Sequence, residues 1–202
     1  VLLSSVSAKG AASGVSVMAD GVPILSGNIR GVGRVIFSVG DKNPAQKILL
    51  PGTKNEPLFQ LKVVAEEESF ILKEIKLKAS GTADDSKLFD KVVLIDDKDN
   101  SGTFNDGDSL LAQTDFSADD GELLFSPAFE LTGTVNLLVV ADTSTTLDNK
   151  LRTFLLSLLS ENDIKLVYKD SGAELLPSGQ YPLSSPLFNI GGGAYIRKGD
   201  KS

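Results

Sequence analysis

The sequence predicts an all-β fold, an antiparallel β-sandwich with extended N- and C-terminal arms. Short segments in which apolar and polar residues alternate with a two-residue period recur along the chain. Turn-forming residues separate these segments at the regular spacing of sandwich strands. The 202 residues are 41% hydrophobic, which suffices for one large core. With no Trp and few Tyr, that core must consist mainly of Leu, Val, Ile and Phe.

Individual strands are predicted from their side-chain patterns. Residues 70–79 alternate apolar and charged side chains, which is typical of a strand with one solvated face. Residues 135–141 are nearly all apolar and predict a central strand buried on both faces. The predicted strands are 35–39, 58–65, 70–79, 91–96, 110–116, 122–125, 135–141 and 164–168.

Three connections complete this prediction. The acidic run Glu66-Glu67-Glu68 predicts an exposed loop between two strands that resists edge pairing. Asp120-Gly121 predicts a tight hairpin turn between 111–116 and 122–125. Residues 151–159 fit either a helical stripe or one face of a strand, and their place between regularly spaced strands favours the strand.

The composition divides the chain into three parts. Residues 1–32 are rich in Gly, Ser, Ala and Val and carry few charges, and they predict an N-terminal arm or donor-strand segment. Residues 33–176 predict the sandwich, and residues 177–202 a C-terminal strand or tail. Each arm would either pair with a neighbouring molecule or fold back as the first or last strand of its own domain.

Charge and composition exclude several classes of function. The net charge of −7, without any Lys/Arg cluster, argues against nucleic acid as a partner. The absence of His and Cys removes the commonest general base and all thiol chemistry, so we expect no enzyme. No apolar run is long enough to span a membrane. No intact signal peptide opens the chain, and we expect an extracellular or cell-surface protein whose signal peptide has been removed.

Residues 97–108 have the spacing of a twelve-residue calcium loop. Oxygen-bearing side chains occupy its first, third, fifth, ninth and twelfth positions, a glycine is sixth, and the seventh residue offers its backbone carbonyl. Calcium prefers such hard oxygen ligands. An acidic β-turn loop without an ion is the alternative. The predicted Ca²⁺ ligands are Asp97, Asp99, Ser101, Thr103, Asn105 and Asp108.

Further carboxylates lie close to this loop in the sequence. The alternatives for these residues are that they complete its coordination shell, form a second calcium site, or are solvated loop residues. They are Asp84, Asp85, Asp90, Asp96 and Asp106. The pair Asp119-Asp120 is explained by the predicted hairpin turn.

Six short motifs follow one another in the central part of the chain: Asn43-Pro44-Ala45, Pro51-Gly52-Thr53, residues 80–85, Val93-Leu94-Ile95-Asp96-Asp97, residues 117–121, and Leu138-Val139-Val140-Ala141-Asp142. In the order of these motifs, residues 33–170 resemble a β-sandwich module that recurs in large secreted and surface proteins of bacteria and archaea. The resemblance implies an immunoglobulin-like or jelly-roll-like sandwich with a structural role and no catalysis. The acidic loop also resembles dockerin loops, but a dockerin has two such loops with helices, and here one loop lies between predicted strands.

Together these features predict a calcium-stabilised subunit of an extracellular filament or surface layer. The arms would add strands to neighbouring copies by donor-strand complementation, giving a head-to-tail homopolymer. The alternative is an accessory adhesion or carbohydrate-binding module whose partner is a surface glycan, which the scarcity of aromatic residues disfavours.

Overall fold

The computed structural model describes residues 33–146 and 151–191, together with the backbone of four short strands in the first 32 residues. Residues 1–32 form one unit and residues 33–202 a second. In the first unit β1 (Leu2–Leu3) pairs with β4 (Ile24–Leu25), and β2 (Ser7–Lys9) pairs with β3 (Ser16–Met18). The rest of the N-terminal arm, and the end of the C-terminal tail from residue 192, lie outside the described residues.

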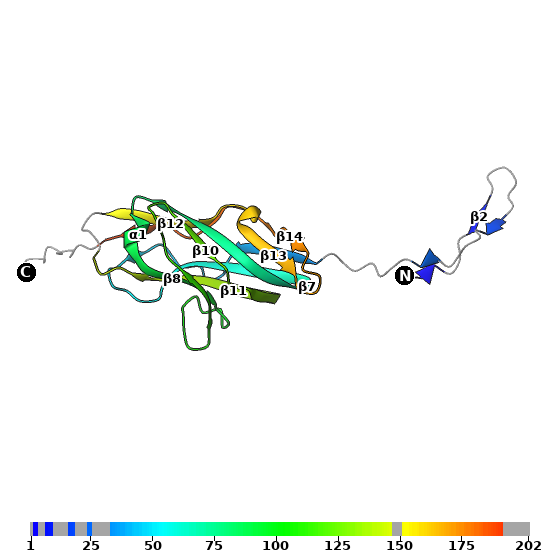
Figure 1. Ribbon diagram of the computed structural model, residues 1–202, viewed down its shortest axis with the longest axis horizontal. Coiled ribbons are helices and arrows are strands. Elements are labelled where there is room, and N and C mark those ends of the chain that lie inside the picture. Colours follow the sequence, from blue (N-terminus) through cyan, green and yellow to red (C-terminus); the bar gives the residue numbers. More distant parts are fainter. Residues whose placement is uncertain are drawn as a thin grey trace, which may run out of the picture. The chain divides into compact units, whose positions relative to one another are not determined.

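The long strand β7 organises the second unit (Figure 1). Its first half pairs with β5 and most of β11, and its second half pairs with β10, β12, β13 and the start of β11, so one strand belongs to both halves of the sandwich. A left-handed residue, Glu67, lies between the two halves, with a φ of 67°. The strands are β5 (Arg34–Val39), β7 (Glu56–Gly81), β10 (Glu122–Phe125), β11 (Phe129–Thr143), β12 (Arg152–Leu158) and β13 (Ile164–Tyr168).

The remaining strands extend this curled sheet. β11 pairs with β8, and β8 pairs with β9, which is an edge strand. β17 lies between β12 and β6, while β14, β15 and β16 pair with β13, β5 and β12. Two short pairs, β5 with β15 and β6 with β17, are parallel and all others are antiparallel among the described strands. The bounds are β6 (Ile48–Leu49), β8 (Phe89–Asp96), β9 (Ser109–Thr114), β14 (Glu174–Leu175), β15 (Ser178–Gly179), β16 (Leu183–Ser184) and β17 (Phe188–Ile190).

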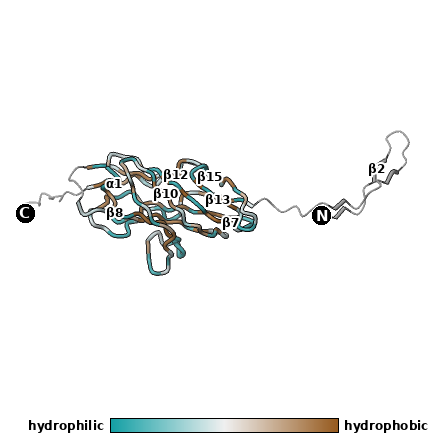
Figure 2. Tube along the Cα trace, viewed as in Figure 1, coloured by the Kyte–Doolittle hydropathy of each residue, from teal (hydrophilic) through white to brown (hydrophobic). Residues whose placement is uncertain are grey.

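One apolar core fills the interior, and hydrophobic segments of the chain alternate with polar ones along the strands that surround it (Figure 2). Its side chains are aliphatic apart from a group of phenylalanines, in which the rings of Phe89 and Phe154 meet edge to face at 4.9 Å between centroids. The all-β sandwich prediction is confirmed. In the described part of the chain, no helix combines the length and the hydropathy needed to cross a membrane.

Residues 137–141 of β11 are buried on both faces, which confirms most of the prediction for residues 135–141. Leu137, Val139 and Ala141 point into the main core. Leu138 and Val140 form a smaller cluster on the opposite face with two residues of β8, and Phe104 packs against it. The loop 97–108 thus covers the outer face of the sheet.

Two connections differ from the prediction, and two open alternatives are decided. The described part of the C-terminal arm, up to residue 191, folds back onto its own domain, because β15, β16 and β17 pair with β5, β12 and β6. The predicted hairpin at Asp120-Gly121 is wrong, because β10 pairs with residues 75–78 of β7 while β9 pairs with β8. The run Glu66-Glu67-Glu68 is no separate loop but part of the continuous β7, in which Glu67 supplies the left-handed residue. Residues 152–158 form a strand, as favoured.

Candidate metal centre

The candidate site is the loop of residues 97–108, which connects the end of β8 to the start of β9. The two strands pair at Asp96 and Ser109, so both ends of the loop are held by the sheet. Gly102, at the sixth position, has a φ of +73°, which favours glycine. A Cβ atom there would lie 2.7 Å from the carbonyl oxygen of Lys42. The sixth-position glycine is therefore required by both the backbone angle and the close approach.

Asp97 at the first position is fully buried and anchors the loop. Its Oδ1 accepts a hydrogen bond from the backbone N–H of Ser101 at 3.0 Å, and its Oδ2 accepts one from Gly102 at 2.9 Å. Oδ2 also accepts a 2.7 Å hydrogen bond from Gln60. A carboxylate has about four acceptor sites, so Asp97 keeps one for an ion.

Gln60 of β7 connects this loop to the sheet. Its side chain is fully buried, and Nε2 donates to Asp97 and also to Asn100 at 3.0 Å. Its Oε1 accepts the backbone N–H of Lys42 at 2.7 Å. A Cβ atom at Gly40 would collide with this amide, which explains the glycine there. The strand pattern places Gln60 on the polar face of β7, and nothing in the sequence identifies it as the partner of a loop 37 residues away.

Asp97, Asp99 and Asp108 converge, since one carboxylate oxygen from each lies within 4.8 Å of the others. Asp99 accepts hydrogen bonds from the N–H of Ser101 and from the amide of Asn105. Asp108 accepts the backbone N–H groups of Lys98 and Asn105. Each of these two side chains keeps free acceptor sites, so the three carboxylates fit a divalent cation.

The other predicted ligands surround the same centre. The hydroxyl of Ser101 donates to the carbonyl oxygen of Thr103 at 3.0 Å, and the Ser101 and Thr103 hydroxyls lie 3.1 Å apart. The Nδ2 of Asn105 donates to Asp99 at 3.1 Å, while its Oδ1 accepts the N–H of Gly107. Asn105 would have to rotate its amide to present an oxygen to an ion.

Several carboxylates lie close together in the site, and their negative charges influence each other's pKa. Hydrogen bonds, chiefly from Ser101, hold the pKa of Asp99 below its usual range. Burial raises the pKa of Asp96, and the neighbouring charges of Asp108 and Asp97 raise it further, against the opposing effect of Lys98. A cation between these carboxylates would relieve their mutual repulsion.

The additional acidic residues do not join this centre. Asp106 is exposed, and Asp96 lies in β8. Asp84 forms an ion pair with Lys87 at 2.5 Å. Asp85 lies in the short helix α1 (Asp85–Leu88), at the opposite end of β8, a strand about 25 Å long. Burial, with the nearby charges of Asp119 and Asp120, raises the pKa of Asp85 to about 7.

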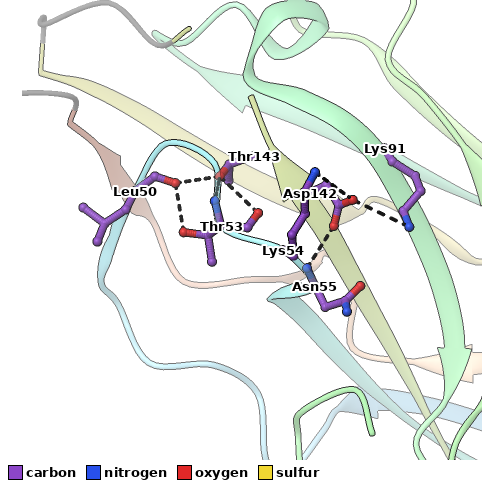
Figure 3. Close-up of polar contacts among 7 residues, drawn as sticks. All are labelled: Leu50, Thr53, Lys54, Asn55, Lys91, Asp142 and Thr143. Carbon is purple, nitrogen blue, oxygen red and sulfur yellow. Dashed lines mark hydrogen bonds and ion pairs between the residues drawn. The ribbon is translucent and has the colours of Figure 1, made fainter. Parts of the chain in front are cut away.

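A separate polar network holds the residue 50–55 segment against the end of β11 (Figure 3). The hydroxyl of Thr143 donates to the carbonyl of Leu50 at 2.6 Å and accepts the N–H of Thr53 at 2.9 Å. Asp142 accepts the N–H of Asn55 at 2.9 Å and pairs with Lys54 and Lys91. These contacts give the Pro51-Gly52-Thr53 and Ala141-Asp142 motifs a structural role.

Comparison with known proteins gives weak similarities only. No family model and no curated protein matches the chain. A chain of the complex of CaDoc0917 with CaCohA2 is 12% identical with a TM-score of 0.32, over 79% of this chain and 99% of that one. A chain of a type I cohesin–dockerin complex from Clostridium thermocellum is 9% identical with a TM-score of 0.30, over 78% and 98%. AvmM, which catalyses a macrocyclisation, is 10% identical with a TM-score of 0.32, over 81% and 89%. We draw no functional conclusion from similarities of this size.

Proposed function

We propose that the protein is a structural subunit of an extracellular filament or surface layer, stabilised by calcium and joined to its neighbours by strand exchange. The observation that carries this proposal is that the loop with converging carboxylates leads directly into the edge strand β9. Asp97, Asp99 and Asp108 would hold the ion, with Ser101, Asn105 and the carbonyl of Thr103 as further ligands. Calcium would fix the geometry at which β9 begins.

β9 has the properties of an acceptor strand. It pairs with β8 on one side and has no second strand partner among the described residues. Its sequence, Ser-Leu-Leu-Ala-Gln-Thr, carries no charge, and Leu110 is 56% exposed. Protected edge strands usually carry charges, prolines or bulges against pairing with other chains. β9 has neither a charge nor a proline, although its register with β8 shifts by one residue at Leu111. The lack of charge and the exposed Leu110 favour the addition of a strand from a neighbouring molecule.

The N-terminal segment supplies the matching donor. Residues 1–32 form a unit of their own, and the strand partners of the described body strands all lie in residues 34–190. The segment is apolar and almost without charge, so it can add main-chain hydrogen bonds to an edge and place alternate side chains on the sheet. Because donor and acceptor lie in different parts of one chain, repetition gives an open head-to-tail polymer.

The proposal is tested by measuring the size of the purified protein in calcium and in EDTA. Light scattering after size exclusion, with negative-stain electron microscopy, should show filaments or higher oligomers in calcium and smaller species in EDTA. A matched magnesium sample controls for ionic strength. A monomer in all conditions would contradict assembly and favour the glycan-binding alternative, which a glycan array would then examine.

A further inference from the structure

A second group of carboxylates lies where α1 meets the turn before β10. One oxygen each from Asp85, Asp119 and Asp120 lies within 4.8 Å of the other two. Asp119 and Asp120 are exposed, whereas Asp85 is only 1% exposed. The group therefore has one ligand fixed inside the protein and two at the surface.

Asp85 is the unusual member, because neither of its carboxylate oxygens has a hydrogen-bond partner among the described residues. The backbone N–H groups of Asp120 and Gly121 lie near enough to lower the pKa of Asp85, although neither meets the geometry of a hydrogen bond. A buried charge without a partner is strongly unfavourable, and native proteins pair such groups or use them to coordinate a metal.

The nearby basic side chains do not neutralise Asp85. Lys87 is paired with Asp84, and Arg152 donates to the carbonyl oxygen of Thr82 at 3.0 Å. Lys78 donates to the carbonyl oxygen of Asp120 at 2.5 Å, not to its carboxylate. None of these contacts is with Asp85 itself, although Lys87 lies near enough to Asp119 for the two charges to attract each other.

We propose that Asp85, Asp119 and Asp120 form a second divalent-cation site, independent of the loop 97–108 and suited to Ca²⁺. Calcium binds oxygen at about 2.3–2.6 Å, so two of its ligands lie at most about 5 Å apart, and the observed cluster satisfies this limit. The exposed side leaves room for the water ligands that complete a calcium shell. Carboxylates alone select a hard cation over zinc or copper.

This second ion would connect two elements that are distant in the sequence. Asp85 belongs to α1, before β8, whereas Asp119 and Asp120 belong to the turn that leads into β10. That turn already contacts β7, since the N–H of Ala79 donates to the carbonyl oxygen of Gly121 at 3.0 Å. An ion would therefore join α1, this turn and the second half of β7.

The site is tested in the full chain by removing the loop site first. The double variant Asp99→Ala/Asp108→Ala is titrated with CaCl2, and separately with MnCl2, by calorimetry and equilibrium dialysis at about pH 8, above the ordinary carboxylate pKa. We expect it to retain one ion per chain. Adding Asp85→Asn should remove that ion, and adding Asp119→Asn/Asp120→Asn should weaken it at least about tenfold. Asp90→Asn, an exposed carboxylate in β8, is the matched control.

The outcomes separate this site from the assembly proposal. The Asp119→Asn/Asp120→Asn change alters exposed side chains only, so a folded variant with weakened binding supports the site even if Asp85→Asn impairs folding. Failure of the loop variant to bind either ion, with a melting temperature in EDTA equal to that of the parent, would overturn the proposal. So would retention of the ion after Asp85→Asn. Neither result bears on whether the protein forms filaments.

Discussion

At the scale of single residues, Asp97 and Asp99 carry different tasks although both belong to the proposed calcium loop. Asp97 is buried and accepts three hydrogen bonds from protein donors. Asp99 is exposed and accepts hydrogen bonds only from residues of its own loop. Asp97 therefore stabilises the fold with or without an ion. Asp99 contributes little to stability when no ion is bound.

This difference predicts that Asp99→Ala leaves the melting temperature in EDTA nearly unchanged but removes the part of the calcium response that comes from the loop 97–108. In the parent, calcium at about 100 times its Kd should raise the melting temperature by roughly 5–10 °C, because only the folded state binds the ion. Asp97→Ala should lower the melting temperature even in EDTA. Differential scanning calorimetry in both conditions measures these effects.

Asp106→Ala is the control for the loop variants, because Asp106 is exposed in the same loop and is outside the carboxylate cluster. It should keep the calcium response. A parent protein whose melting temperature ignores calcium would show that the loop is only a turn.

Gln60 gives a second prediction at this scale. Replacement by Leu would leave Asp97, Asn100 and the N–H of Lys42 without their buried partner. Each unsatisfied buried group costs about 1–3 kcal/mol, so Gln60→Leu should lower the free energy of unfolding by at least about 2 kcal/mol. Urea denaturation measures this loss. Gln113→Leu, on the exposed face of β9, should change stability by less than about 0.5 kcal/mol. Equal effects of the two substitutions would contradict a specific role for Gln60.

Asp142 predicts a pH dependence of stability. Burial raises its pKa, but hydrogen bonds from Asn55 and Lys54 and the charge of Lys91 outweigh burial, so the pKa in the folded state is lowered. Its unfolded pKa is about 3.9, and the stabilisation is therefore fully present above that pH and lost as pH falls through the folded value. Asp142→Asn should destabilise the protein by about 1–2 kcal/mol at neutral pH, and the difference should shrink below about pH 4.

Urea denaturation between about pH 2.5 and 7 measures this dependence. Asp90→Asn serves as the control, because Asp90 is exposed and should show no comparable loss. A difference between Asp142→Asn and the parent that stays constant across this range would exclude the proposed linkage.

At the scale of elements, local patterns predicted strand identity better than strand pairing. The alternation in β7 and the apolar run in β11 report burial, which is a property of each segment alone. The partner of β10 depends on the second half of β7, about 45 residues earlier in the chain, and no local pattern encodes it. The Asp120-Gly121 turn has the composition of a hairpin turn. It nevertheless connects β9, which pairs with β8, to β10, which pairs with β7.

In the candidate site, too, features set by consecutive residues could be predicted, and contacts between distant segments could not. Ligand spacing in the loop depends on consecutive residues, so the convergence of Asp97, Asp99 and Asp108 was readable from sequence. Gln60 was not, because its partners come from a distant segment. The sequence named Asp85 as one open candidate for a second calcium site, but not its neighbours Asp119 and Asp120, which were assigned to a turn. The burial of Asp85 and its unpartnered oxygens are known only from the structure.

The edge strand β9 predicts that Leu110→Lys prevents assembly without affecting folding. Leu110 is more than half exposed, so its loss should hardly change the free energy of unfolding. A lysine on an edge strand opposes the addition of another strand by bringing a charge into the new interface. Light scattering and electron microscopy in calcium should then show monomers with the melting temperature of the parent. Leu176→Lys, at an equally exposed leucine outside the strands, should assemble normally. Filaments formed by Leu110→Lys would place the acceptor elsewhere.

At the scale of the whole molecule, the proposed assembly depends on the separation of the chain into two units. The described body strands find all their partners within residues 34–190, so the body does not need the first 32 residues to complete its sheet. Deletion of residues 1–30 should therefore leave the melting temperature of the body within about 2 °C of the parent, since surface changes away from the core cost little. It should also abolish filaments, because the donor segment is removed.

The same truncation allows the exchange to be reconstructed in trans. A peptide of residues 1–30 should bind the truncated body with one-to-one stoichiometry, because the segment supplies backbone hydrogen bonds that an edge strand lacks. Binding should disappear in the Leu110→Lys body, because the substitution changes the acceptor strand β9. It should also disappear in EDTA, because EDTA removes the ion that is proposed to fix the start of β9. A scrambled peptide of the same composition controls for non-specific apolar contact. If the truncated body still polymerises, the N-terminal segment is no donor, and the contacts between subunits must lie in the body itself.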